Sequence, residues 1–201
     1  MKHLAKIASY LFHPVLIPTM VTGCFYWMSS NFFITFETYI ATGQVFLMTC
    51  LLPICIYLFL KSLGLLKSSI MITNVRERSA PIFLNIVIIA ILVFKIWQDT
   101  ANTTLKYFFV AYAISNIILY FSVLLKRKYS IHVAYLCAVI PLFINPTTTY
   151  YINPFIVLPI LLVIIGIVAS ARLYLSAHTN VEVILGALIG FTPGFILFYS
   201  M

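Results

Sequence analysis

The sequence predicts an all-α protein, a polytopic bundle of six or seven transmembrane helices that forms a single transmembrane domain over residues 1–201. Three observations predict this fold class. Of the 201 residues, 63% are hydrophobic and only 8% are charged, whereas an average soluble domain is about 25% charged. The apolar residues form continuous runs, near the length of about 20 residues that crosses a bilayer core. They do not alternate with polar residues as the strands of a membrane barrel do.

The apolar runs follow one another along the chain with short polar breaks between them. Residues 1–14 place Lys2, His3 and Lys6 among apolar residues, and we expect a short helix at the membrane interface there. Pro81 opens the third run, where the first turn of a helix tolerates it. The expected spans cover roughly residues 15–36, 43–63, 81–97, 106–125, 131 to the mid-140s, 154–173 and 179 to the end.

The alternation of spans sorts the charged residues between the two membrane faces. The breaks after the second, fourth and sixth spans lie on the face that also holds the N-terminus. That face collects ten of the twelve Lys and Arg residues, namely Lys2, Lys6, Lys61, Lys67, Arg76, Arg78, Lys126, Arg127, Lys128 and Arg172. We therefore expect three charged segments, far apart in sequence, to meet at one surface. The positive-inside tendency predicts that this surface is cytoplasmic.

Composition and charge exclude several classes of function. The net charge of +8 does not predict nucleic-acid binding, because the basic residues interrupt apolar runs and form no soluble basic patch. The expected partners are membrane lipids and a lipid substrate that carries phosphate. Cys24, Cys50, Cys55 and Cys137 all lie inside apolar runs, without metal-site spacing or a disulfide framework. We expect no metal and no other cofactor.

The break before the last span combines a histidine, a carboxylate and an arginine. His178 and Glu182 are four residues apart and share one helix face. A carboxylate there can accept the proton of one imidazole nitrogen and leave the other nitrogen free to attack. Arg172 lies six residues before His178 and can reach over the site as a two-pronged anion clamp.

The other two breaks on this face add further candidates. Lys128, Ser130 and His132 stand at the start of the fifth span. Ser130 is either a helix N-cap or a phosphate ligand, and His132 can act as a general acid toward a leaving alkoxide. Arg76 and Arg78 precede the third span, and they can balance negative charge that develops on a transferring phosphoryl group.

These residues resemble the signatures of the type 2 phosphatidic acid phosphatase (PAP2) superfamily. Arg172-x5-His178-x3-Glu182 is similar to the third signature, Ser-Arg-x5-His-x3-Asp, with Glu182 where Asp is usual. Ser130-Ile131-His132 is similar to the second, Pro-Ser-Gly-His, in keeping Ser-x-His.

The first signature, Lys-x6-Arg-Pro, has a weaker counterpart in Arg76-Glu77-Arg78-x2-Pro81, where Met71 stands in the place of the lysine. The three segments occur in the order of the family, and the resemblance covers about residues 67–190.

The resemblance implies a PAP2/haloperoxidase-like helical core over about residues 67–201 and a metal-independent phosphatase of membrane lipids. It implies that His178 is the nucleophile, that Glu182 orients it and that His132 protonates the leaving group. The expected phosphate ligands are Ser130, Arg78 and Arg172, with Arg76 and Lys128 beside them.

The expected function is hydrolysis of a lipid phosphate or pyrophosphate, such as phosphatidic acid, phosphatidylglycerophosphate or a polyprenyl pyrophosphate, through a phosphohistidine. The expected location is the bacterial inner (cytoplasmic) membrane, where the family usually works on the outer face. One alternative is a relative without catalysis that binds or transports lipid phosphates. Another is an ion or proton transporter with Glu182 in the relay, which would show inverted repeats. Oligomeric state is not predicted.

Several charged residues near the site are expected to have no chemical role. Lys126 and Arg127 are interpreted as topology anchors at the membrane surface. His3 and His13 are interpreted as interfacial residues.

Overall fold

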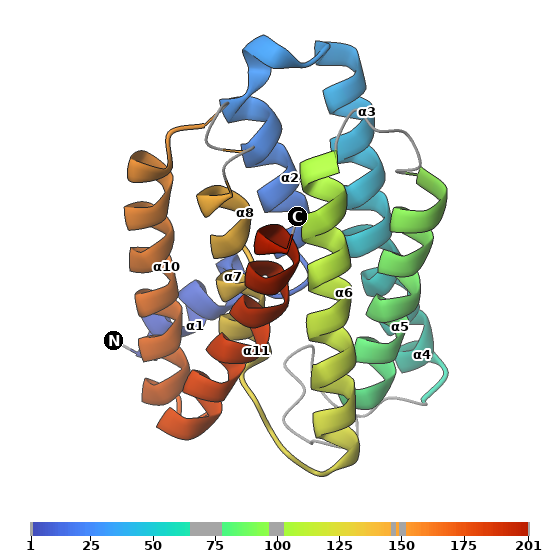
Figure 1. The fold of residues 1–201 in the computed structure, drawn as a ribbon. Helices are drawn as coiled ribbons and strands as arrows, with labels where there is room; N and C mark the ends of the chain where they lie inside the picture. The colour runs from blue at the N-terminus through green and yellow to red at the C-terminus, as the bar shows by residue number, and fades with distance from the viewer. Residues whose placement is uncertain (1, 65–77, 97–102, 146–147, 149–151, 201) are drawn as a thin grey trace.

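The computed structural model describes residues 2–64, 78–96, 103–145, 148 and 152–200, and the elements in these ranges are all helical (Figure 1). No strand occurs in this part of the chain. The helices are α1 (Lys2–Leu11), α2 (Ile17–Met28), η1 (Ser30–Phe32), α3 (Thr35–Phe46), η2 (Leu47–Leu51), α4 (Leu52–Ser62), α5 (Ser79–Ile91), η4 (Leu92–Ile96), α6 (Thr103–Leu124), α7 (Ile131–Cys137), α8 (Ile140–Ile144), α10 (Pro154–Tyr174) and α11 (Asn180–Tyr199).

Four helices are long and apolar enough to cross a membrane. They are the continuous helix Thr35–Ser62, made of α3, η2 and α4, together with α6, α10 and α11. The apolar helices Ser79–Phe94 and Ile131–Ile144 are shorter, and α2 has 12 residues. Length and composition therefore indicate an all-helical membrane protein, although only four of the expected spans reach full length among the described residues.

The first two expected spans differ from the helices that form. The run expected over residues 15–36 ends as a helix at Met28, where the polar run Ser29-Ser30-Asn31 begins and Ser29 bonds to the carbonyl oxygen of Phe25. The backbone N–H of Ser29 donates to that oxygen over 3.0 Å and its hydroxyl donates over 2.6 Å. The next helix then begins at Thr35, well before the expected residue 43. Polar residues that favour a turn mark this boundary. Hydropathy alone predicted that the span would continue past it.

A π-helical segment, η2, interrupts the longest helix just before Pro53. Proline has no N–H to donate to the carbonyl four residues earlier, and its ring crowds that carbonyl. That carbonyl belongs to residue 49, inside the π-helical segment. The wider turn therefore accommodates a proline within the membrane-length helix.

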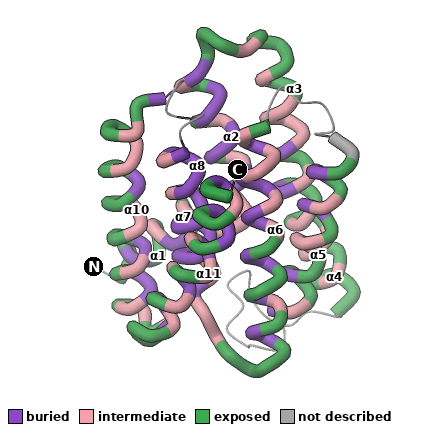
Figure 2. The backbone as a smooth tube through the Cα atoms, in the orientation of Figure 1, coloured by how far each residue is buried: buried purple, intermediate pink, exposed green. Residues whose placement is uncertain are grey.

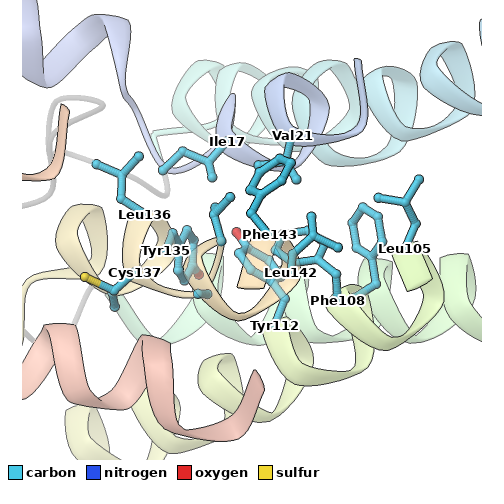
Figure 3. Packing of buried hydrophobic residues seen from close by; sticks show 14 of the residues in the cluster. Ile17, Val21, Leu105, Phe108, Tyr112, Tyr135, Leu136, Cys137, Leu142 and Phe143 are labelled. Carbon is cyan, nitrogen blue, oxygen red and sulfur yellow. The ribbon is translucent and has the colours of Figure 1, made fainter. Parts of the chain in front are cut away.

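The core of the bundle is built around α7 and α8. Buried residues gather along these two short helices, whereas α10 and α4 present mostly exposed residues (Figure 2). Side chains from α2, α6, α7 and α8 interdigitate there, among them Ile17, Phe108, Tyr112 and Leu142 (Figure 3). The outward faces of the long helices carry large apolar residues such as Phe155 and Ile156, as expected where lipid is the solvent.

Three glycines allow α11 to lie directly against α7 and α8. Gly186, Gly190 and Gly194 recur every fourth residue on α11. A Cβ atom at Gly186 would lie 2.8 Å from the carbonyl oxygen of Ser130, and one at Gly190 would overlap the carbonyl oxygen of Ala134. Small residues at this spacing let the backbones of membrane helices approach closely. This contact fixes the start of α7 beside the start of α11.

The helix directions bring the expected charged segments to one end of the bundle. α5, α7 and α11 all begin at the lower end in Figure 1, and α6 and α10 end there. The segments that carry Arg78, Ser130 and His178 therefore lie at the same end, as the alternation of spans predicted.

Candidate functional site

A hydrogen-bonded pair, His178 and Glu182, lies at the centre of the candidate site. Nδ1–H of His178 donates to Oε2 of Glu182 over 2.9 Å. The same carboxylate oxygen accepts the backbone N–H of Thr179 at 3.2 Å, while Oγ1 of Thr179 accepts the N–H of Glu182 at 3.3 Å. This reciprocal capping box begins α11. One carboxylate thus starts the helix and orients the imidazole, whose Nε2 keeps its lone pair.

The environment of His178 keeps its imidazole neutral. The residue is 7% exposed. Burial lowers the pKa of His178 to about 4, against an opposing hydrogen bond to Glu182, and the positive charges of Arg78, Arg172 and Lys128 lower it further. The neutral ring is the form that a nucleophilic histidine needs. The same charges show that Arg78, Arg172 and Lys128 all lie within electrostatic reach of this ring.

Arg172 reaches the site from the last turn of α10. The helix ends in a Schellman motif, in which Ala177 N–H donates to the carbonyl of Arg172 at 3.0 Å and Ser176 N–H donates to that of Leu173 at 2.9 Å. Ser176 has a φ of 51°, the left-handed conformation that this motif needs. The motif reverses the chain within a few residues, and Arg172 itself is buried, with 6% of its surface exposed.

The segment before α7 starts with a second Schellman motif. Arg127 N–H donates to the carbonyl of Ser122 at 2.8 Å and Lys126 N–H donates to that of Val123 at 2.9 Å, with Lys126 at a φ of 58°. Lys126 and Arg127 are exposed, whereas Lys128 is half-buried. Of the three basic residues in this run, Lys128 is the one whose charge acts on His178.

Ser130 and His132 face the site with polar atoms that no described residue satisfies. Ser130 occupies the N-cap position of α7, but its side chain makes no capping bond. Its Oγ and the Nε2 of His132 are both buried and have no hydrogen-bond partner within the described ranges. The backbone N–H of Ser130 donates to the carbonyl of Glu182 at 3.1 Å. The side chain of Ser130 therefore does not cap α7, and its role as a phosphate ligand stays a prediction.

Arg78 brings the third segment to the site at the start of α5. It is 7% exposed. Burial and the nearby Arg172 lower the pKa of Arg78, and the carboxylate of Glu182 raises it. Arg78 therefore lies close to both Arg172 and Glu182. Arg76, the other arginine proposed as a phosphate ligand, lies outside the described residues, as do Lys67 and Met71.

The charges at this end of the bundle favour an anion. Among the described residues here, Arg78, Arg172 and Lys128 contribute three positive charges against the single carboxylate of Glu182. A phosphate group is compact, carries up to two negative charges and accepts several hydrogen bonds, so it would complement these cations and the free Oγ and Nε2 atoms. In the described ranges, no three His, Cys, Asp or Glu side chains lie together so as to hold a metal ion.

Sequence reasoning missed two features of the site. His13, interpreted as interfacial, lies against His132 with ring centroids 5.6 Å apart at an interplanar angle of 84°. The glycine repeat that joins α11 to α7 was also missed, although its four-residue spacing is visible in the sequence. His13 gives no such signal, because it lies far from every other site residue along the chain.

Comparison with known proteins adds no further information on this site. The chain matches no family model, no curated protein and no solved structure.

Proposed function

We propose that this protein is a membrane lipid phosphatase of the PAP2 type, which hydrolyses a lipid phosphate or pyrophosphate through a phosphohistidine. One observation carries the proposal. A neutral imidazole, oriented by a carboxylate, lies within electrostatic reach of three cationic side chains, at the end of the bundle that also holds two buried polar atoms without a described partner. Glu182 replaces the Asp that is usual in the family, and its longer side chain still reaches His178 Nδ1 at 2.9 Å.

The first chemical step transfers the phosphoryl group to the protein. Nε2 of His178 attacks phosphorus, a P–N bond forms and the bond from phosphorus to the lipid oxygen breaks. The leaving oxygen takes a proton from Nε2–H of protonated His132. Arg78, Arg172 and Lys128 stabilise the negative charge on the equatorial oxygens, and the hydroxyl of Ser130 donates to one of them.

The second step returns the protein to its starting state. The now neutral His132 accepts a proton from a water molecule, whose oxygen attacks phosphorus as the P–N bond breaks. Inorganic phosphate leaves, His132 is protonated again and Nε2 of His178 regains its lone pair. Glu182 accepts the hydrogen bond from Nδ1–H of His178 in both steps. This hydrogen bond stabilises the positive charge on the phosphorylated imidazole.

A seven-helix crossing of a bacterial inner membrane accommodates this chemistry. In that arrangement α2, Ser79–Phe94 and Ile131–Ile144 complete the crossing with the four long helices, and the lipid tail enters from the bilayer between helices. The excess of basic residues puts the site face in the cytoplasm. A Lys126→Cys variant without the four native cysteines tests the side. Labelling by an impermeant maleimide only after the cells are opened agrees with the cytoplasm, and labelling of intact cells contradicts it.

The decisive test is phosphate release by the purified protein. We expect release from at least one of phosphatidic acid, phosphatidylglycerophosphate and a polyprenyl pyrophosphate, in the presence of a chelator. His178→Ala should reduce the rate by about 10³-fold or more, since it removes the nucleophile. His3→Ala is a matched control, because His3 is exposed on α1. With a substrate carrying labelled phosphorus, an alkaline detergent quench should trap an adduct in the wild type that is stable in base and lost in acid, and none in His178→Ala.

The outcomes separate the candidate functions. Unchanged turnover in His178→Ala would rule out the phosphohistidine. Lipid phosphate that binds without being hydrolysed, even by the wild type, would favour the binding or transport protein instead.

A further inference from the structure

The N-terminal helix α1 turns one face of small residues toward the site. Ala5 and Ser9 are its buried residues, and His13 follows at the same four-residue spacing. The hydroxyl of Ser9 donates a hydrogen bond to the backbone carbonyl of Ala5 at 2.9 Å. The opposite face carries exposed apolar residues, of which Leu4 and Ile7 are 68% and 60% exposed. Helix α1 also packs against α10, the helix that supplies Arg172.

Two contacts from this segment meet the imidazole of His132. The backbone of Ser9 makes a hydrogen bond to the ring. The ring of His13 meets it edge to face, with centroids 5.6 Å apart. His13 is itself held in place, since its Nδ1 accepts the backbone N–H of Val15 at 3.4 Å. His132 Nε2, which has no partner among the described residues, is left for the site.

We propose that His13 is a positioning residue for His132, which together with the backbone of Ser9 holds the imidazole so that Nε2 faces the phosphate. This inference rests on the proposed phosphatase function and deepens it, because it adds the N-terminal helix to a site otherwise built from the three charged segments.

The chemistry explains why His132 needs such support. Its Nε2 must give a proton to the leaving oxygen in the first step and take one from water in the second, from one fixed position. His132 is the second residue of the seven-residue helix α7, so it lies at an element end with little helix of its own around it. A small misplacement of a reacting group can reduce a rate by about 100-fold.

The charges around His13 favour a positioning role over direct contact with the phosphate. Charged and titratable groups that act on the two rings are Arg172 from α10 and, toward His132, also His178 from the turn before α11. Burial and the positive charge of Arg172 lower the pKa of His13. A neutral His13 then supports the ring of His132 without adding charge to the anion site.

The test compares two replacements of His13 in the full-length protein. His13→Ala removes the ring, and His13→Phe keeps an aromatic ring able to make the same edge-to-face contact without a titratable nitrogen. We expect His13→Ala to lower kcat by about 10- to 100-fold with KM within about twofold, because ground-state binding is unchanged. We expect His13→Phe to recover most of kcat with the pH profile of the wild type. His3→Ala serves as the matched control, because His3 is exposed on α1, the helix that precedes His13.

Each outcome has one meaning. The positioning role would be overturned if His13→Ala kept the wild-type kcat, or if only its KM changed. It would also be overturned if His13→Phe lost as much kcat as His13→Ala. A wild-type protein that releases no phosphate from any lipid would instead overturn the proposed function on which the inference rests. Binding of inorganic phosphate, measured by calorimetry, checks that the site is intact in each variant. Where His13→Ala fails to fold, the kcat of His13→Phe and of His13→Gln decides, with Phe expected to be the more active.

Discussion

Two polar clusters share helices α5 and α7, and only one of them carries charge. The intramembrane cluster consists of Asn85 on α5, Asn116 on α6 and Tyr135 on α7. Nδ2 of Asn85 donates to Oδ1 of Asn116 at 3.0 Å and to the hydroxyl of Tyr135 at 3.2 Å, and that hydroxyl donates to Oδ1 of Asn116. The charged site uses the starts of α5 and α7, and Asn85 follows Arg78 by seven residues, or about 10 Å along a helix.

The difference between the clusters lies in which polar atoms remain available. The amide and hydroxyl groups of Asn85, Asn116 and Tyr135 bond to one another and join three helices, which is a common way to hold membrane helices together. The charged site retains Ser130 Oγ and His132 Nε2 without described partners, and beside the neutral cluster the hydroxyl of Tyr112, packed against Tyr135, also has none. Buried polar groups without partners are costly, and only the charged cluster combines them with cationic side chains, whereas the hydrogen bonds of the neutral cluster join helices.

Among substitutions in the two clusters, Glu182→Gln is expected to have the largest effect, on the rate of phosphate release. Glutamine keeps the capping box, which accepts Glu or Gln at this position, but it removes the carboxylate that accepts the Nδ1–H of His178. We expect phosphate release to fall by about 10³-fold, or about 4 kcal/mol in the barrier, while the melting temperature changes little. A large fall in melting temperature with a normal rate per folded molecule would show that Glu182 acts only as a cap.

Gly190→Ala should separate the elements that carry both clusters. Its Cβ would overlap the backbone of α7 at Ala134, so the two helices must move apart, at a cost of about 3 kcal/mol. Gly166→Ala is the control, since nothing lies within 4 Å of its Cβ position on α10. Thermal unfolding in detergent measures the effect. Equal stability of the two variants would contradict the close approach of α7 and α11.

The pH dependence of kcat/KM reports the charges around His178. Since the pKa of His178 is lowered from its ordinary 6.5 to about 4, the ring stays neutral as pH falls through 6.5, and activity that depends on it is lost only at more acid pH. Lys128→Gln removes one positive charge, so the pKa of His178 should rise and the acid limb should move to higher pH.

Lys126→Gln is the matched control for this shift, because Lys126 is exposed and its replacement should leave the limb in place. An acid limb at the ordinary value of 6.5 that neither substitution moves would contradict the environment described for His178.

The smallest effect is expected in the neutral cluster. Tyr135→Phe keeps the ring and removes the hydroxyl, which should lower the free energy of unfolding by about 1 kcal/mol, as is typical of hydrogen bonds between membrane helices. We expect kcat to stay within about twofold of the wild type, because the cluster does not contact the phosphate. Loss of phosphate release in Tyr135→Phe at unchanged stability would show that the neutral cluster is part of the site and would contradict the difference between the two clusters.

The helical boundaries show where hydropathy is sufficient and where it is not. The runs expected over residues 106–125 and 154–173 agree within a few residues with α6 and α10, because an uninterrupted apolar run has no internal reason to break. The run expected over residues 15–36 failed, because the polar residues Ser29-Ser30-Asn31 favour a turn at the end of α2, within a stretch that hydropathy predicts as one span. Local turn preference thus overrode composition at that end.

The sequence by itself determined that this chain is an α-helical membrane protein, since its charged fraction is too low to cover a soluble surface. It also predicted the pairing of His178 with Glu182 from their four-residue spacing, but His178 precedes the N-cap Thr179, so the capping box and not a shared helix face turns the carboxylate toward the imidazole. Only the tertiary structure decided that His13 lies against His132 and that Lys128 acts on His178. Those relations depend on how separate helices pack, on glycines at a close backbone contact and on two tight helix ends, which no local pattern around the interacting residues specifies.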